Sequence, residues 1–213
     1  MSATRKRSTA WVALAAAGLC SLGLGFASFL TLDAQFPFPE QRLRRPSSTV
    51  VRDVEGRPLR VFLAPDDRYR LPVGLDDVSP ELVRALVGSE DRWFYRHPGV
   101  NPLAVLRATW SNLRARRVVS GASTIPMQIA RMVESRPRTF GAKLVEAFRA
   151  LQLDWHHDKD ELLELYLNLT PYGGNLEGVE AAAWRYFEKP ASRLSLGEAA
   201  LLAALPRSPI RYD

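Results

Sequence analysis

The chain has 213 residues, of which 46% are hydrophobic, and a formal charge of +6. That is enough for one well-packed domain with a short appendage. Residues 1–45 hold six Lys and Arg against two acidic residues, so the rest of the chain carries only about +2. A nucleic-acid-binding domain concentrates positive charge on its folded part, so we expect no nucleic-acid partner. The single cysteine, Cys20, excludes an intrachain disulfide.

The first predicted element is a membrane anchor at residues 10–32. This run contains no charged residue, and as a helix it would be roughly 34 Å long, enough to span a bilayer. It exceeds the apolar region of about 7–15 residues that is typical of a cleaved secretory signal. The cluster Arg5-Lys6-Arg7 precedes it, so the positive-inside rule predicts a cytoplasmic tail at residues 1–9 and an external domain after Leu32.

Residues 33–48 are rich in proline and basic residues, which is typical of a stem leaving the membrane. We interpret the basic side chains of this stem as solvated rather than bound to lipid headgroups. Residues 49–63 follow, with β-branched and aromatic residues on both sides of Glu55-Gly56. This pattern predicts a β-hairpin, and it is the only good strand signal in the chain.

From Ser79 onward the pattern is helical. Caps of the Ser-Pro, Asn-Pro or capping-box type begin four helices, at Ser79-Pro80, Asn101-Pro102, Asp158 with Glu161, and Ser195 with Glu198. Two more helices are predicted at about residues 141–155 and 176–187. Apolar residues recur on one stripe of the second capped helix, at Leu103, Leu106, Trp110 and Leu113. We expect Trp, Phe and Tyr at such spacings to pack in the core.

The first segment whose side chains could take part in catalysis is Glu90-Asp91, which is followed by Trp93, Phe94 and Tyr95. A carboxylate partly buried among aromatic rings has a raised pKa, which suits a proton acceptor. The alternative is a solvated glutamate on a helix surface, the usual role of an isolated Glu-Asp pair. His97, taken alone, is interpreted as a residue at a helix C-terminus that interacts with the helix dipole.

Further motifs follow in a fixed order. Gly121 to Gln128 is a loop of small residues that runs into a helix, Lys143 and Glu146 share one helix face, and residues 159–168 end in Glu-x-Tyr-Leu-Asn. Together with the Glu-Asp-x-x-Phe-x-x-His-x-Gly pattern of residues 90–99, they resemble the motifs of the family 51 glycosyltransferases. These are the peptidoglycan polymerases that join lipid II units, and the resemblance covers about residues 46–213.

The resemblance has departures. The second motif has Pro126 and Met127 where Thr and Gln are usual, and Met there is similar to the penicillin-binding protein 1C branch. Proline in the first helical turn is sterically acceptable, so we expect the fold to survive. Arg131 replaces the usual Lys, Ala142 stands where a second cation is common, and Glu188 replaces a usual Gly. A Lys–Glu pair such as Lys143–Glu146 is, in most proteins, only a salt bridge on a helix surface.

The resemblance implies a mainly α, lysozyme-like glycosyltransferase domain at residues 49–213, with the hairpin as a short stem element. It implies that Glu90 is the base, that Glu146 assists at the donor, and that a divalent cation such as magnesium takes part. Pyrophosphate contacts are implied for Arg131, Arg138 and Lys143, and substrate contacts for Asp91, Ser123, Thr124 and Gln128. The implied partners are lipid II, undecaprenyl-pyrophosphate-linked glycan, the cytoplasmic membrane and other cell-wall synthesis proteins.

Two other functions stay open. A lysozyme-like glycan hydrolase would also use a carboxylate in a helical cleft, although it would not need three cations between Arg131 and Lys143. The chain stops at Asp213, before the family's last helical stretch and before any Ser-x-x-Lys transpeptidase motif. We therefore expect either a domain truncated at its C-terminus, for which a catalytically dead scaffold is an alternative, or the front part of a larger bifunctional protein.

Overall fold

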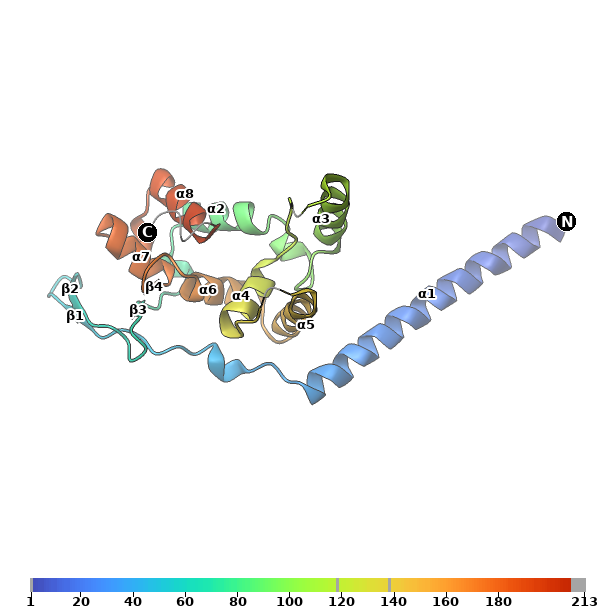
Figure 1. The fold of residues 1–213 in the computed structure, drawn as a ribbon, viewed down its shortest axis with the longest axis horizontal. Coiled ribbons are helices and arrows are strands. Elements are labelled where there is room, and N and C mark those ends of the chain that lie inside the picture. Colours follow the sequence, from blue (N-terminus) through green and yellow to red (C-terminus); the bar gives the residue numbers. More distant parts are fainter. Residues whose placement is uncertain (1, 118, 138, 208–213) are drawn as a thin grey trace. The chain divides into compact units, whose positions relative to one another are not determined.

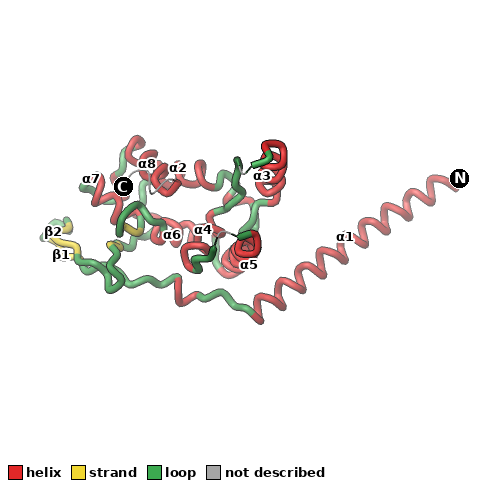
Figure 2. Tube along the Cα trace, in the orientation of Figure 1, coloured by secondary structure: helices red, strands yellow, loops and turns green. Residues whose placement is uncertain are grey.

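The computed structural model describes residues 2–117, 119–137 and 139–207, with side chains described between residues 16 and 206 of these ranges. The chain forms two compact units, residues 1–39 and residues 40–213. Helices dominate both units, and the few strands are short (Figures 1 and 2). The prediction of a mainly α protein is therefore confirmed.

The first unit contains helix α1, Ser2–Gln35. Its segment Ala16–Gln35 is long and apolar enough to cross a membrane by length and composition alone, and it shares residues 16–32 with the predicted anchor. The hydroxyls of Ser21 and Thr31 donate to the carbonyls of Ala17 and Ala27 one turn earlier. These polar groups are thus satisfied within the helix, as a hydrocarbon environment requires.

The second unit begins with a 3₁₀ turn, Glu40–Arg42, and a hairpin. Strands β1, Val50–Arg52, and β2, Pro58–Val61, pair antiparallel, which confirms the hairpin. The Asp53 carboxylate closes its turn by accepting from the backbone N–H groups of Glu55 and Arg57 at 3.0 and 2.8 Å. Gly56 lies in the turn at φ +80°, a conformation that favours glycine.

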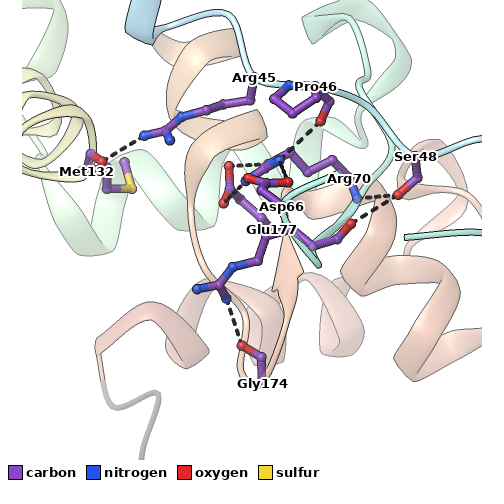
Figure 3. Close-up of polar contacts among 9 residues, drawn as sticks. Arg45, Pro46, Ser48, Asp66, Arg70, Met132, Gly174 and Glu177 are labelled. Carbon is purple, nitrogen blue, oxygen red and sulfur yellow. Dashed lines mark hydrogen bonds and ion pairs between the residues drawn. The ribbon is translucent and has the colours of Figure 1, made fainter. Parts of the chain in front are cut away.

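A second strand pair was not predicted. Strand β3, Tyr69–Arg70, pairs parallel with β4, Leu176–Glu177. Arg70 is buried here, and its guanidinium contacts the carboxylates of Asp66 and Glu177 and donates to the Pro46 carbonyl (Figure 3). A buried arginine that meets two carboxylates keeps its hydrogen-bonding groups satisfied. The cluster therefore joins residues 46–70 to the C-terminal part of the domain.

We had expected the basic side chains of the stem to be only solvated, but two of them contact helix α4, Ile125–Val133, or its C-terminal end. Arg45 donates to the Met132 carbonyl at 3.1 Å (Figure 3). Arg42 lies 3.6 Å from the Glu134 carboxylate, with 61% of its own side chain exposed. Both contacts reach the C-terminal end of helix α4, where positive charge is favourable. The N-terminal end of this unit is thus attached to the helix that carries the second motif.

Four of the remaining helices begin at the predicted caps. Helix α2, Pro80–Glu90, has Ser79 as its N-cap, and α3, Pro102–Ala115, has Asn101. Helices α6, Lys159–Leu169, and α8, Leu196–Ala204, both have the predicted capping boxes. Helix α5 is Phe140–His156, while α7, Val179–Phe187, starts later than predicted because Leu176–Glu177 belongs to β4. Short 3₁₀ turns complete the unit, at Leu75–Asp77, Phe94–Arg96, Ala191–Arg193 and Leu205–Arg207.

The core lies where α2 packs against α8 and where α4 packs against α5 and α6 (Figure 1). Fully buried apolar side chains come from each of these helices, among them Leu82, Ile129, Leu153, Leu162 and Leu202.

The prediction that Trp, Phe and Tyr at helical spacings pack in the core is wrong in part. Phe94, Tyr166 and Tyr172 are buried, but Trp93, Tyr95, Trp110, Phe140 and Trp155 are about half exposed or more. The largest departure is the apolar face of α3, whose Leu103, Leu106, Trp110 and Leu113 are 67–76% exposed. Among the described residues of α3, only Ala108 is buried. A large exposed apolar patch indicates a surface that contacts something other than water.

Candidate active site

Glu90 is the last residue of α2 and is half-buried. Its Oε2 accepts a hydrogen bond of 2.9 Å from the Gln128 Nε2 of α4. The Gln128 Oε1 in turn accepts a long, weak bond of 3.5 Å from the Tyr166 hydroxyl of α6. Three helices therefore converge on this carboxylate, and the first two motifs meet through a direct side-chain contact.

The aromatic surroundings of Glu90 differ from those predicted. Of the three aromatic residues that follow it, Trp93 and Tyr95 are about half exposed, and only Phe94 is buried. The buried tyrosines near Glu90 come instead from α6 and the loop after it. Burial raises the pKa of the Tyr172 phenol well above its usual range, and Tyr166 and the Glu90 carboxylate raise it further. The sequence pattern assigned neither tyrosine a place near Glu90, although Tyr166 lies in the Glu-x-Tyr-Leu-Asn motif.

Asp91 is buried beneath this site. Both of its carboxylate oxygens lie 3.0 Å from the His97 Nε2, and its Oδ2 also accepts from the Ile125 backbone N–H at 3.1 Å. Asp91 and His97 are 6% and 7% exposed. His97 does lie at the C-terminal end of a short helix, the 3₁₀ turn Phe94–Arg96. Its ring pairs with the Asp91 carboxylate, a contact that the sequence did not predict. The geometry favours a supporting role for Asp91 over direct contact with a substrate.

The start of α4 places the second motif. Thr124 is the N-cap, and its side-chain oxygen accepts from the Met127 N–H at 3.4 Å while its hydroxyl donates to the Gly99 carbonyl. Pro126 lies in the first helical turn, as expected, and the helix forms. Ser123 directly precedes this N-cap, and Gln128 is the fourth residue of the helix, so the second motif spans the N-terminus of α4.

Gly99 explains why the first motif ends in glycine. Its backbone has φ +69°, and a Cβ atom added there would lie 2.3 Å from the carbonyl oxygen of Ala150 in α5. Any side chain would force these two backbones apart. Close approach of the first motif to α5 therefore depends on this glycine.

Lys143 and Glu146 of α5 form the second part of the site. The Lys143 Nζ donates to Glu146 Oε2 at 2.7 Å and to the Ser123 hydroxyl oxygen at 2.8 Å. Glu146 is 8% exposed, whereas 41% of the Lys143 side chain is exposed. A partly exposed ion pair contributes little to stability. The bond to Ser123 indicates that this pair faces the second motif and is more than a helix-surface salt bridge.

Of the two other predicted cations, the structure describes only Arg131. Arg131 is exposed on α4 and makes no hydrogen bond or ion pair with another described residue. Arg138 lies outside the described residues. Within the described part of the chain, no group of three His, Cys, Asp or Glu side chains could hold a metal ion. The described residues alone therefore supply no ligand set for a divalent cation.

Comparison with known proteins gives matches over the region that contains these motifs. The transglycosylase family model matches residues 55–213. The chain is 46% identical to penicillin-binding protein 1C of Escherichia coli K12 over 201 residues, covering 94% of this chain and 25% of that protein. It is 41% identical to penicillin-binding protein 1A of Aquifex aeolicus over 169 residues, covering 79% of this chain and 23% of that protein.

The chain spans about a quarter of the length of these curated relatives. The similarity to penicillin-binding protein 1C agrees with Met127, which suggested the 1C branch. The family expected from the motifs is confirmed, and the chain belongs to the transglycosylase family, the family 51 glycosyltransferases.

Proposed function

We propose that this chain is a peptidoglycan glycosyltransferase that polymerises lipid II. It transfers a growing undecaprenyl-pyrophosphate-linked glycan onto the 4-hydroxyl of the GlcNAc of lipid II, which gives a β-1,4 bond with inversion. The observation that carries this proposal is the N-terminal turn of α4. There Gln128 contacts Glu90, and Ser123 contacts Lys143 beside Glu146. A candidate base and a candidate cation thus meet the same helix end.

In this reaction Glu90 is the general base. The bond between the donor sugar and its pyrophosphate breaks, the acceptor oxygen bonds to the same carbon, and the proton of the acceptor hydroxyl passes to the Glu90 carboxylate. Gln128 orients that carboxylate, since its bond to Oε2 restricts the rotation of the side chain. A positioned base of this kind contributes about 10²–10⁴-fold to a rate.

The leaving pyrophosphate takes the electron pair and gains negative charge. Lys143 is half exposed and held by Ser123 and Glu146, so its ammonium is pre-placed for this charge. Arg131 and Arg138 complete the cationic site in this proposal, and an arginine can bind phosphate oxygens through two nitrogens. Glu146 acts at the donor by holding Lys143. We also propose that the domain has the lysozyme-like fold that the family resemblance implies.

The exposed face of α3 supports work at a membrane surface. Its Leu103, Leu106, Trp110 and Leu113 form an apolar patch, and both substrates carry lipid tails. We place this face on the outer surface of the cytoplasmic membrane, with α1 as a single-pass anchor and residues 1–9 in the cytoplasm. Protease added to intact spheroplasts should then digest the domain. A protected domain, or a mature protein starting near Asp33, would contradict this topology.

One assay separates the proposed function from its two alternatives. The solubilised protein is incubated with labelled lipid II, and the products are separated by size. Glycan polymer with release of undecaprenyl pyrophosphate supports the proposal. A parallel sample receives labelled glycan strands, and their shortening would indicate a hydrolase. Lipid II and glycan strands that both stay unchanged would indicate a scaffold. Glu90→Gln serves as the control for a contaminating polymerase, since a contaminant would be unaffected by the substitution.

A further inference from the structure

Lys159, the first residue of α6, connects three parts of the domain. Its Nζ donates to the His97 carbonyl at 2.7 Å and forms an ion pair with Asp154 of α5. The same ammonium lies 4.9 Å from the centroid of the buried Phe94 ring, within the range of a cation–π interaction. Only 23% of its side chain is exposed. Two of its three partners, Phe94 and His97, belong to the segment that directly follows Glu90.

Helix α6 itself does not need a lysine at this place. Asp158 and Glu161 already form a reciprocal capping box at its start. A positive charge in the first helical turn is unfavourable with the helix dipole, and burying most of an ammonium costs desolvation. The contacts of Lys159 therefore lie with the neighbouring segment, and local helix formation does not explain the residue.

The contacts continue from Lys159 to the candidate base. The backbone of His97 is held by Lys159, and the ring of His97 pairs with Asp91. Asp91 directly follows Glu90 in the chain and also accepts from the Ile125 N–H at the start of α4. The next residue of α6 adds a parallel contact, since Asp160 accepts from the Tyr95 hydroxyl at 3.1 Å. The first turn of α6 thus holds residues 94–97 through the contacts of Lys159 and Asp160.

We propose that Lys159 is a positioning residue, which sets the place of Glu90 relative to the N-terminal turn of α4 through residues 91–97. The inference rests on the proposed role of Glu90 as the base. Lys159 touches neither substrate nor reacting atoms in this proposal. Its loss displaces the base while leaving the binding surface formed by Ser123 and Lys143 in place.

The test compares Lys159→Met and Lys159→Arg in the full chain, with lipid II as substrate. Methionine keeps an apolar stem over Phe94 and removes the ammonium. We expect kcat to fall about tenfold or more with KM within about twofold, because small misplacements of a reacting group can cost up to about 10²-fold. Arginine keeps the charge and should restore part of kcat. The control is Lys189→Met, which breaks a partly exposed ion pair with Glu198 away from this segment and should leave kcat unchanged.

A purely structural role for Lys159 would give a different pattern. Circular dichroism at the assay temperature reports the folded fraction of each variant. A kcat that matches the parent, or that falls only in proportion to the folded fraction, overturns the inference. If Lys159→Met does not fold, Lys159→Gln replaces it, because an amide can still donate to the His97 carbonyl. Glutamine should then give a lower kcat than arginine, and equal values would overturn the inference.

The two proposals fail in distinguishable ways. A parent protein that does not polymerise lipid II overturns the proposed function, and the inference falls with it. A parent that polymerises, a Glu90→Gln variant that does not, and a fully active Lys159→Met variant overturn the inference alone.

Discussion

The amide of Gln128 lies 2.9 Å from the Glu90 carboxylate, although 38 residues separate them in the chain. The contact means that the rotamer of the candidate base is set by α4 and not only by its own helix. Gln128 keeps its other amide atom towards Tyr166, so its donor side faces Glu90. Substitutions around Glu90 should therefore separate effects on chemistry from effects on fold.

Glu90→Gln should abolish polymerisation while the fold is retained. The amide has the shape of the carboxylate, and its oxygen can still accept from Gln128, but it cannot take a proton at neutral pH. We expect a loss of about 10²–10⁴-fold in turnover. The measurement is lipid II polymerisation beside a thermal melt of the same sample. Turnover within a few-fold of the parent would remove Glu90 from the mechanism.

Changing Lys143, Arg131 or Arg138 to Ala should lower turnover, with Lys143 among the most sensitive. Removing one donor to a developing charge costs about 10²–10³-fold in rate. Lys143→Ala also leaves the nearly buried Glu146 without its cation. Melting temperatures are measured with the rates. A variant that loses stability and keeps activity would show that the substituted cation has a structural role and does not act on the pyrophosphate.

Gly99→Ala should destabilise the domain. The added methyl group meets the Ala150 carbonyl oxygen at 2.3 Å in a backbone with positive φ, and strain of this kind costs on the order of 1–3 kcal/mol or more. Chemical denaturation gives the change in unfolding free energy. Gly88→Ala is the control, because a Cβ at this helical position meets nothing within 4 Å. It should stabilise α2 by about 0.5–1 kcal/mol, and equal effects of the two substitutions would contradict the close approach.

Tyr172→Phe should stabilise the domain. The Tyr172 hydroxyl is buried and has no hydrogen-bond partner among the described residues, and an unsatisfied buried group costs about 1–3 kcal/mol. Burial raises the pKa of this phenol well above its usual range, so it keeps its proton and the gain should be the same at neutral and mildly alkaline pH. Tyr186→Phe is the matched control. It removes a hydroxyl that donates to the Tyr172 carbonyl at 2.7 Å and should destabilise, so a loss of stability in both variants would refute the prediction.

Local signals in the sequence predicted much of the fold. The Pro and capping-box signatures place the starts of α2, α3, α6 and α8 because a cap depends on residues within one helical turn. The hairpin follows from its own turn residues in the same way. The parallel pairing of Tyr69–Arg70 with Leu176–Glu177 could not be read, since it joins segments more than a hundred residues apart.

The sequence identified the residues of the candidate site, but it predicted few of the contacts between them. The spacing of Lys143 and Glu146 placed both on one helix face, and their ion pair agrees with this. The bond from Gln128 to Glu90 and the burial of Asp91 with His97 depend on how separate helices pack. Periodicity also predicted an apolar stripe on α3, but it cannot tell a face that meets the core from one that meets another medium.

The exposed leucines and Trp110 of α3 bear on how the protein can be handled. A version that starts at Glu40, without the apolar N-terminal helix, would still present this patch to the buffer. We expect such a protein to self-associate in detergent-free solution and to disperse when micelles cover the patch. Purification strategies that remove only the N-terminal helix would therefore not yield a monodisperse sample, and glutamate or lysine at Leu106 and Leu113 would be the first substitutions to try.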